Sequence, residues 1–67
     1  MLKLPLGYEL LSATPRPVLL HSANGQVSLR CEAWVLASFV HSIRVRANDG
    51  AEDDIKIDVI GRIEAVS

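Results

Sequence analysis

The chain has 67 residues, a mass of 7.3 kDa and a formal net charge of −1. A single domain of this size buries only about 60% of the surface that its unfolded chain exposes, so its core alone is a weak source of stability. The single cysteine, Cys31, excludes an intrachain disulfide and a zinc site built from several cysteines, and the net charge argues against a basic field over the whole surface.

Residues 1–17 predict an N-terminal arm with at most one short element. Leu2, Leu4 and Leu6 alternate as in an extended segment. Prolines at 15 and 17 end any helix, because residues that precede proline avoid the helical region. We expect the leucines of this arm to pack on the domain or on a neighbouring subunit, since hydrophobic residues make up 49% of the chain.

Residues 18–33 predict a β-hairpin. A β-prone run at 18–21 precedes Asn24-Gly25, a pair that tight hairpin turns favour because both residues tolerate positive φ. The eight residues that follow alternate between polar and apolar, as in a half-buried strand. The apolar side chains expected to face the core are Val27, Leu29, Cys31 and Ala33.

Residues 33–42 are consistent with either a helix or a strand. The apolar spacing fits a helix, whereas the alternation that begins at Ile43 favours a strand. We predict a turn or short helix over Val35–Ser38 and then a strand over Phe39–Ala47. A helix over 32–42 would instead give a ββαββ dimer.

The C-terminal third predicts two further strands. Asp49-Gly50 is a hairpin signal, and residues 54–60 alternate with Ile55, Ile57 and Val59 on one face. Gly61 suggests a β-bulge or a sharp bend, and the alternation resumes after it. The predicted fold is therefore mainly β. We expect a small, bent, five-stranded antiparallel barrel over 18–67, preceded by the arm.

This order of elements resembles the Sm-like family over residues 16–66. Pro17-Val18-Leu19-Leu20 is similar to the opening strand of that family, and Asn24-Gly25 to its first turn. Phe39 lies near the position of its base-stacking aromatic, and residues 57–63 resemble the corner between its last two strands. The resemblance implies a homo-oligomeric ring in which the fourth strand of one subunit joins the fifth strand of the next. It also implies binding of single-stranded RNA by aromatic stacking and phosphate contacts.

The candidate RNA-binding residues are Phe39, Arg44, Arg46 and Arg62. Arg44 and Arg46 project from the same strand face, about 7 Å apart, as phosphate contacts would require. Two alternatives stay open. The arginines can pair with acidic residues such as Asp54 or Asp58 across the hairpin, and Phe39 can pack in the core or an interface together with Trp34.

No catalytic residues, metal or cofactor are expected. His21 and His41 fall in separate strands, and Cys31 is expected to be a small core residue. Without a signal peptide or an apolar stretch of about 20 residues, we expect a cytoplasmic, non-enzymatic protein outside the membrane. The leading hypothesis is an Sm-like ring that binds RNA. The alternative is a small protein-interaction module, an inhibitor or adaptor of phage or mobile-element origin that binds one host protein.

Overall fold

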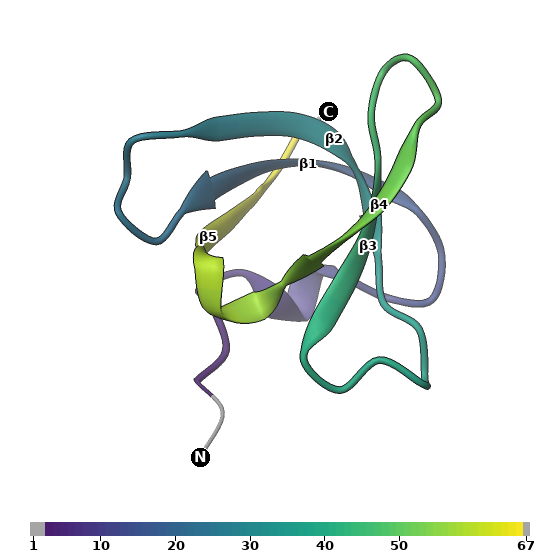
Figure 1. Ribbon diagram of the computed structural model, residues 1–67, viewed down its shortest axis with the longest axis horizontal. Helices are drawn as coiled ribbons and strands as arrows, with labels where there is room; N and C mark the ends of the chain where they lie inside the picture. The colour runs from purple at the N-terminus through teal and green to yellow at the C-terminus, as the bar shows by residue number, and fades with distance from the viewer. Residues whose placement is uncertain (1–2, 67) are drawn as a thin grey trace.

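The computed structural model describes residues 3–66, which form five strands and two single-turn 3-10 helices (Figure 1). In chain order the elements are η1 (Tyr8–Leu10), β1 (Arg16–Ser22), β2 (Ser28–Trp34), β3 (Ser42–Arg46), β4 (Glu52–Lys56), η2 (Ile57–Val59) and β5 (Ile60–Ala65). The strands pair antiparallel in one sheet of order β4-β3-β2-β1-β5. The prediction of a mainly β chain with five antiparallel strands is confirmed. Within residues 3–66, β4 and β5 do not pair with each other, and no helix is long and apolar enough to cross a bilayer.

The predicted hairpin is present as β1 and β2, and its turn follows from the Asn24-Gly25 pair. Gly25 has φ of 74°, and Asn24 Oδ1 accepts a hydrogen bond of 2.9 Å from the Gln26 backbone N–H. The Asn24 side chain therefore accepts a hydrogen bond from a backbone N–H group of the turn. β1 begins at Arg16, so the last two residues of the predicted arm belong to the sheet.

The core lies on one side of the sheet and is closed by η2 and β5. Its members are Val18, Leu20, Cys31, Ala33, Ile43, Val45, Ile57, Ile60 and Ile63. Cys31 is a core residue, as predicted. The prediction for Val27 and Leu29 is wrong, because they are 62% and 41% exposed. β2 pairs with β3 only from Glu32 to Trp34, so the earlier part of β2 extends beyond the region where β3 helps to enclose the core.

The segment between β2 and β3 is a loop with a turn near the expected position Val35–Ser38, so the alternative helix over 32–42 is wrong. The strand expected over Phe39–Ala47 is present as β3, but it is shorter. The Phe39 backbone N–H donates to the Leu36 carbonyl at 2.9 Å, which closes a turn, and β3 begins only at Ser42. The Val35 N–H donates to the Ser12 carbonyl at 2.8 Å. This bond to the N-terminal segment takes the chain out of the sheet directly after Trp34.

Gly61 lies inside β5 at an irregularity of the β1–β5 register, because His21 lies opposite Arg62 and Ser22 opposite Ile60, so the β-bulge expected at Gly61 is confirmed. The bend between β4 and β5 lies just before it, at η2. A Cβ at Gly61 would lie 2.8 Å from the Ser22 carbonyl oxygen, so glycine is needed there for close approach of β5 to β1. The 3-10 turn also explains Val59. It breaks the alternation that was expected to place Val59 beside Ile57, and leaves it 53% exposed.

The arm attaches to the free edge of β5. The Ile63 N–H donates to the Leu6 carbonyl at 2.7 Å, and Leu6 forms an isolated parallel bridge with Arg62. Gly7 follows with φ of 89°. The side chains of Leu4 and Leu6 stay 50% and 71% exposed, while Leu2 lies outside the described residues.

Candidate functional site

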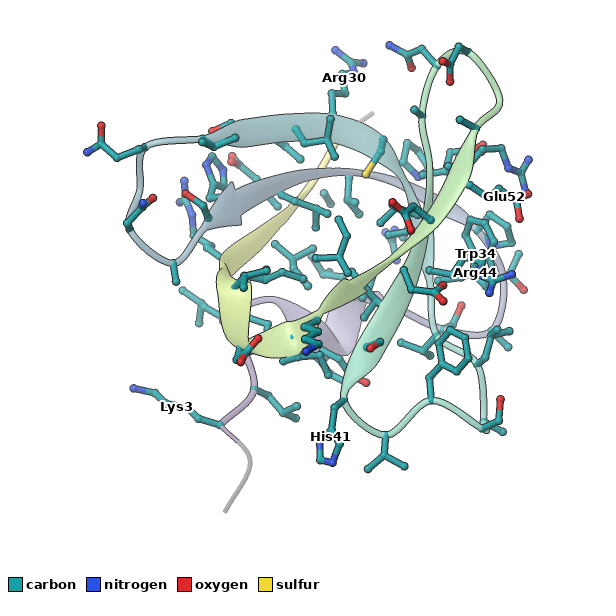
Figure 2. All side chains as sticks on the ribbon, viewed as in Figure 1. Lys3, Arg30, Trp34, His41, Arg44 and Glu52 are labelled. Atoms are coloured by element: carbon teal, nitrogen blue, oxygen red, sulfur yellow. The ribbon has the colours of Figure 1, made fainter. Side chains whose placement is uncertain are left out.

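Two arginines of β3 project from the face of the sheet opposite the core. Arg44 and Arg46 alternate with the buried Ile43 and Val45, so the pleat directs them outward. Strand register then sets their neighbours in two cross-strand rows: Glu32, Arg46 and Glu52 in one, Trp34, Arg44 and Asp54 in the other. Figure 2 shows Trp34, Arg44 and Glu52 gathered on this side of the molecule. We call these six residues and Phe39 the arginine–aromatic face.

Each arginine of this face lies over an aromatic ring. The Arg46 Cζ atom is 5.2 Å from the centroid of Trp34, and the Arg44 Cζ atom is 5.4 Å from the centroid of Phe39. These distances allow cation–π attraction. Trp34 is only 8% exposed although it lies outside the core cluster. A guanidinium stacked in this way is held in a defined orientation.

Three carboxylates neutralise the two guanidinium groups. Arg44 Nε donates to Asp54 Oδ1 at 2.8 Å and Nη2 donates to Oδ2 at 3.4 Å, which is a two-point contact. Arg46 forms ion pairs with Glu32 at 3.5 Å and with Glu52 at 3.3 Å. The hydrogen bond to Asp54 raises the pKa of the Arg44 guanidinium. Pairing of the arginines with acids across the hairpin is therefore confirmed for Asp54, and Glu52 joins it in place of Asp58.

The structure brings together three of the four predicted RNA-binding residues. Phe39, Arg44 and Arg46 share the arginine–aromatic face, whereas Arg62 lies on β5. The sequence interpretation missed Glu32 and Glu52 as partners. A signal for Glu52 was present, because Arg46 and Glu52 lie symmetrically about the turn at 48–50, as Arg44 and Asp54 do.

Arg62 belongs to a second polar cluster, on the outer side of β1, β2 and β5. His21 Nδ1 is 3.0 Å from Ser28 Oγ, and its Nε2 is 3.0 Å from Glu64 Oε1 and 3.1 Å from Arg62 Nη2. The hydrogen bond from His21 lowers the pKa of Glu64, and the Arg62 charge adds to this effect. The cluster joins three strands by side-chain contacts.

Both edges of the sheet are partly covered by the chain itself. The Ala47 N–H donates to the Ala51 carbonyl, and the Ile57 N–H donates to the His41 carbonyl. These two bonds show which residues of β4 direct their backbone N–H groups toward β3 and which direct them away. The Asp54 N–H faces away from β3, and it donates to Asp53 Oδ1 at 2.8 Å. The edge of β4 is also acidic, while Leu6 occupies part of the edge of β5. Such features discourage pairing between sheets.

Within residues 3–66, no three His, Cys, Asp or Glu side chains converge on a position where they could hold a metal ion. Burial raises the pKa of the Cys31 thiol, and the nearby Glu32 charge adds to this effect. Comparisons of the chain with protein-family models, with curated proteins and with solved structures give no match. The chemistry of the arginine–aromatic face is therefore the basis for a functional proposal.

Proposed function

We propose that this chain is a non-enzymatic protein-interaction module that binds another protein through the arginine–aromatic face. One observation carries the proposal: Arg44 and Arg46 are each stacked on an aromatic ring and each paired with carboxylates. Trp and Arg are enriched among the residues that dominate protein interfaces. An inhibitor or adaptor, including one of phage or mobile-element origin, belongs to this class.

Charge favours a protein over a nucleic acid as the ligand of this face. Its two arginines are outnumbered by Glu32, Glu52 and Asp54. Nucleic-acid affinity comes mainly from neutralised phosphates, and three carboxylates would repel a phosphate chain. A protein surface of mixed charge can instead exchange ion pairs with the face and stack planar groups on the exposed sides of the guanidinium groups.

The face can be altered with little loss of folding stability, which makes it testable. Exposed ion pairs contribute at most about 1 kcal/mol each. We suggest affinity capture from a nuclease-treated lysate, with the wild-type chain, Phe39→Ala, Arg44→Ala and the control Arg30→Ala. Arg30 is an exposed β2 arginine outside the face. Circular dichroism checks that each variant is folded.

We expect one protein to be retained by the wild type and by Arg30→Ala after nuclease treatment. Retention should fall by about tenfold or more with Phe39→Ala and Arg44→Ala, because truncating a central interface residue costs about 2 kcal/mol. Capture that depends on intact RNA, or that is indifferent to both variants, would contradict the proposal.

A second candidate is a cytoplasmic, Sm-like (SH3-like) barrel that forms a homo-oligomeric ring and binds single-stranded RNA. It is supported by the gathering of Phe39, Arg44 and Arg46, and by β4 and β5 as the two sheet edges. Ring closure through these edges would require Asp53 and Leu6 to release them.

Two measurements test this candidate. If the ring forms, light scattering shows more than two subunits. Fluorescence titration with oligo-U and oligo-A at low salt, where phosphate contacts are strongest, tests the RNA. Absence of oligonucleotide binding at low salt would rule out the RNA-binding function.

A further inference from the structure

Exposed apolar side chains concentrate around η2. Of the six large hydrophobic side chains that are exposed in residues 3–66, five line two grooves that meet at Ile60. We call these five the η2 apolar surface: Leu4, Leu6, Val27, Leu29 and Val59. The sixth, Val40, is in the loop between β2 and β3. This surface contains the arm, the end of the β1–β2 hairpin and η2.

The two grooves differ in shape. One is formed by the arm and η2, and there Leu6 is 71% exposed. The other is a hollow of about 150 Å³ between the hairpin and η2, with Leu29 and Val59 in its wall. The hollow is lined by apolar side chains apart from His21 and Ser22. The same surface thus contains protruding leucine side chains and an apolar hollow that can accept an aliphatic side chain.

We propose that the η2 apolar surface is the interface of a two-fold symmetric homodimer, in which the arm leucines of each copy cover the hollow of the other. The two grooves adjoin at Ile60. A two-fold axis near Ile60 therefore places the arm groove of each copy against the hollow of the other, as an isologous interface requires. The contact of Leu6 with β5 stays in place, since its backbone makes that contact and its side chain faces outward.

Charge at the rim fits a second copy. Lys3 and Asp58 both line the arm groove, and neither forms an ion pair within the described part of the chain. In a two-fold arrangement each Lys3 can meet the partner's Asp58. The arginine–aromatic face lies elsewhere on the molecule, as Lys3 and Arg44 show in Figure 2. The dimer therefore leaves the proposed partner-binding face free.

The test is the molecular mass by analytical ultracentrifugation over a range of concentrations that starts in the low micromolar. We expect wild type to approach twice 7.3 kDa. Leu6→Glu and Val59→Glu should each raise the dissociation constant by about tenfold or more, because each places a charge in an apolar interface. Val40→Glu is the matched control: Val40 is 68% exposed but outside the surface, and its variant should still dimerise. A monomeric wild type, a larger assembly, or a dimer indifferent to both variants would overturn the proposal.

A charge exchange tests the two-fold geometry itself. Lys3→Glu alone and Asp58→Lys alone should each weaken the dimer, and the double variant should restore it, because the pair is then re-formed with reversed signs. A double variant weaker than either single variant would overturn the pairing. Phe39→Ala and Arg44→Ala should dimerise normally, so failure of the dimer and failure of the proposed partner-binding function can be told apart.

Discussion

At the scale of single residues, Cys31 shows how position on a strand decides chemistry. The residue is 4% exposed, and burial raises the pKa of its thiol, so little thiolate is present at neutral pH. We expect a thiol-specific chromogenic disulfide to modify native Cys31 at least about 100-fold more slowly than the urea-unfolded chain. The control is the double variant Cys31→Ser/Ser38→Cys, which moves the single thiol to an exposed loop. Its thiol should react rapidly in both the native and the urea-unfolded chain. Equal rates for native and unfolded Cys31 would show that the thiol is accessible.

Glu64 gives a prediction on pH. Its pKa is lowered in the folded chain by the hydrogen bond from His21, so the ionised carboxylate favours folding. This contribution is present at neutral pH and disappears as the pH falls through the folded pKa, below the ordinary value of about 4.3. In a carbon-13 NMR titration, His21→Ala should move the midpoint of Glu64 upward. His41→Ala, at an exposed position outside this cluster, should leave it unchanged.

At the scale of elements, sequence patterns correctly predicted those features that depend on residues close together in the chain. The β1–β2 hairpin follows from Asn24-Gly25 and the alternation after it, and the Arg44–Asp54 pair follows from alternation on both sides of a short turn. The elements that the sequence did not reveal depend on distant groups. The loop after Trp34 is held by the Ser12 carbonyl, and the Ala23 N–H donates to the Val59 carbonyl of η2. Period-two alternation contains no information about such bonds.

The arm depends on Gly7, which yields a prediction with a close control. A Cβ at Gly7 would lie 2.0 Å from the Ile63 carbonyl oxygen, whereas Gly50 has the same φ of 89° with open space around it. Gly50→Ala should therefore cost only the conformational penalty of about 1–2 kcal/mol. Gly7→Ala should cost more and should speed hydrogen exchange of the Ile63 amide. Equal losses in urea unfolding would show that the arm does not need this close approach.

At the scale of the whole molecule, the core and the arginine–aromatic face lie on opposite sides of one sheet. Ile43 and Arg44 are neighbours on β3, one fully buried and one in the arginine–aromatic face. We expect Ile43→Ala to reduce the free energy of unfolding by about 2–5 kcal/mol, because it leaves a cavity in a small core. Arg44→Ala should reduce it by about 1 kcal/mol or less. Urea denaturation measures both, and similar losses would show that the outer face supports the fold.

The pairing of β1 with β5 has a consequence for biosynthesis. Val18 is fully buried and lies opposite Ala65, so the first strand of the sheet obtains its cover from a segment translated much later. At about 5–20 residues per second, the ribosome needs roughly 2–9 s to pass from one to the other. During that interval the edge of β1 that pairs with β5 has no partner, and chaperones or proteases can compete for it. A messenger truncated before the codon for Ile60 would yield a chain that cannot complete its sheet.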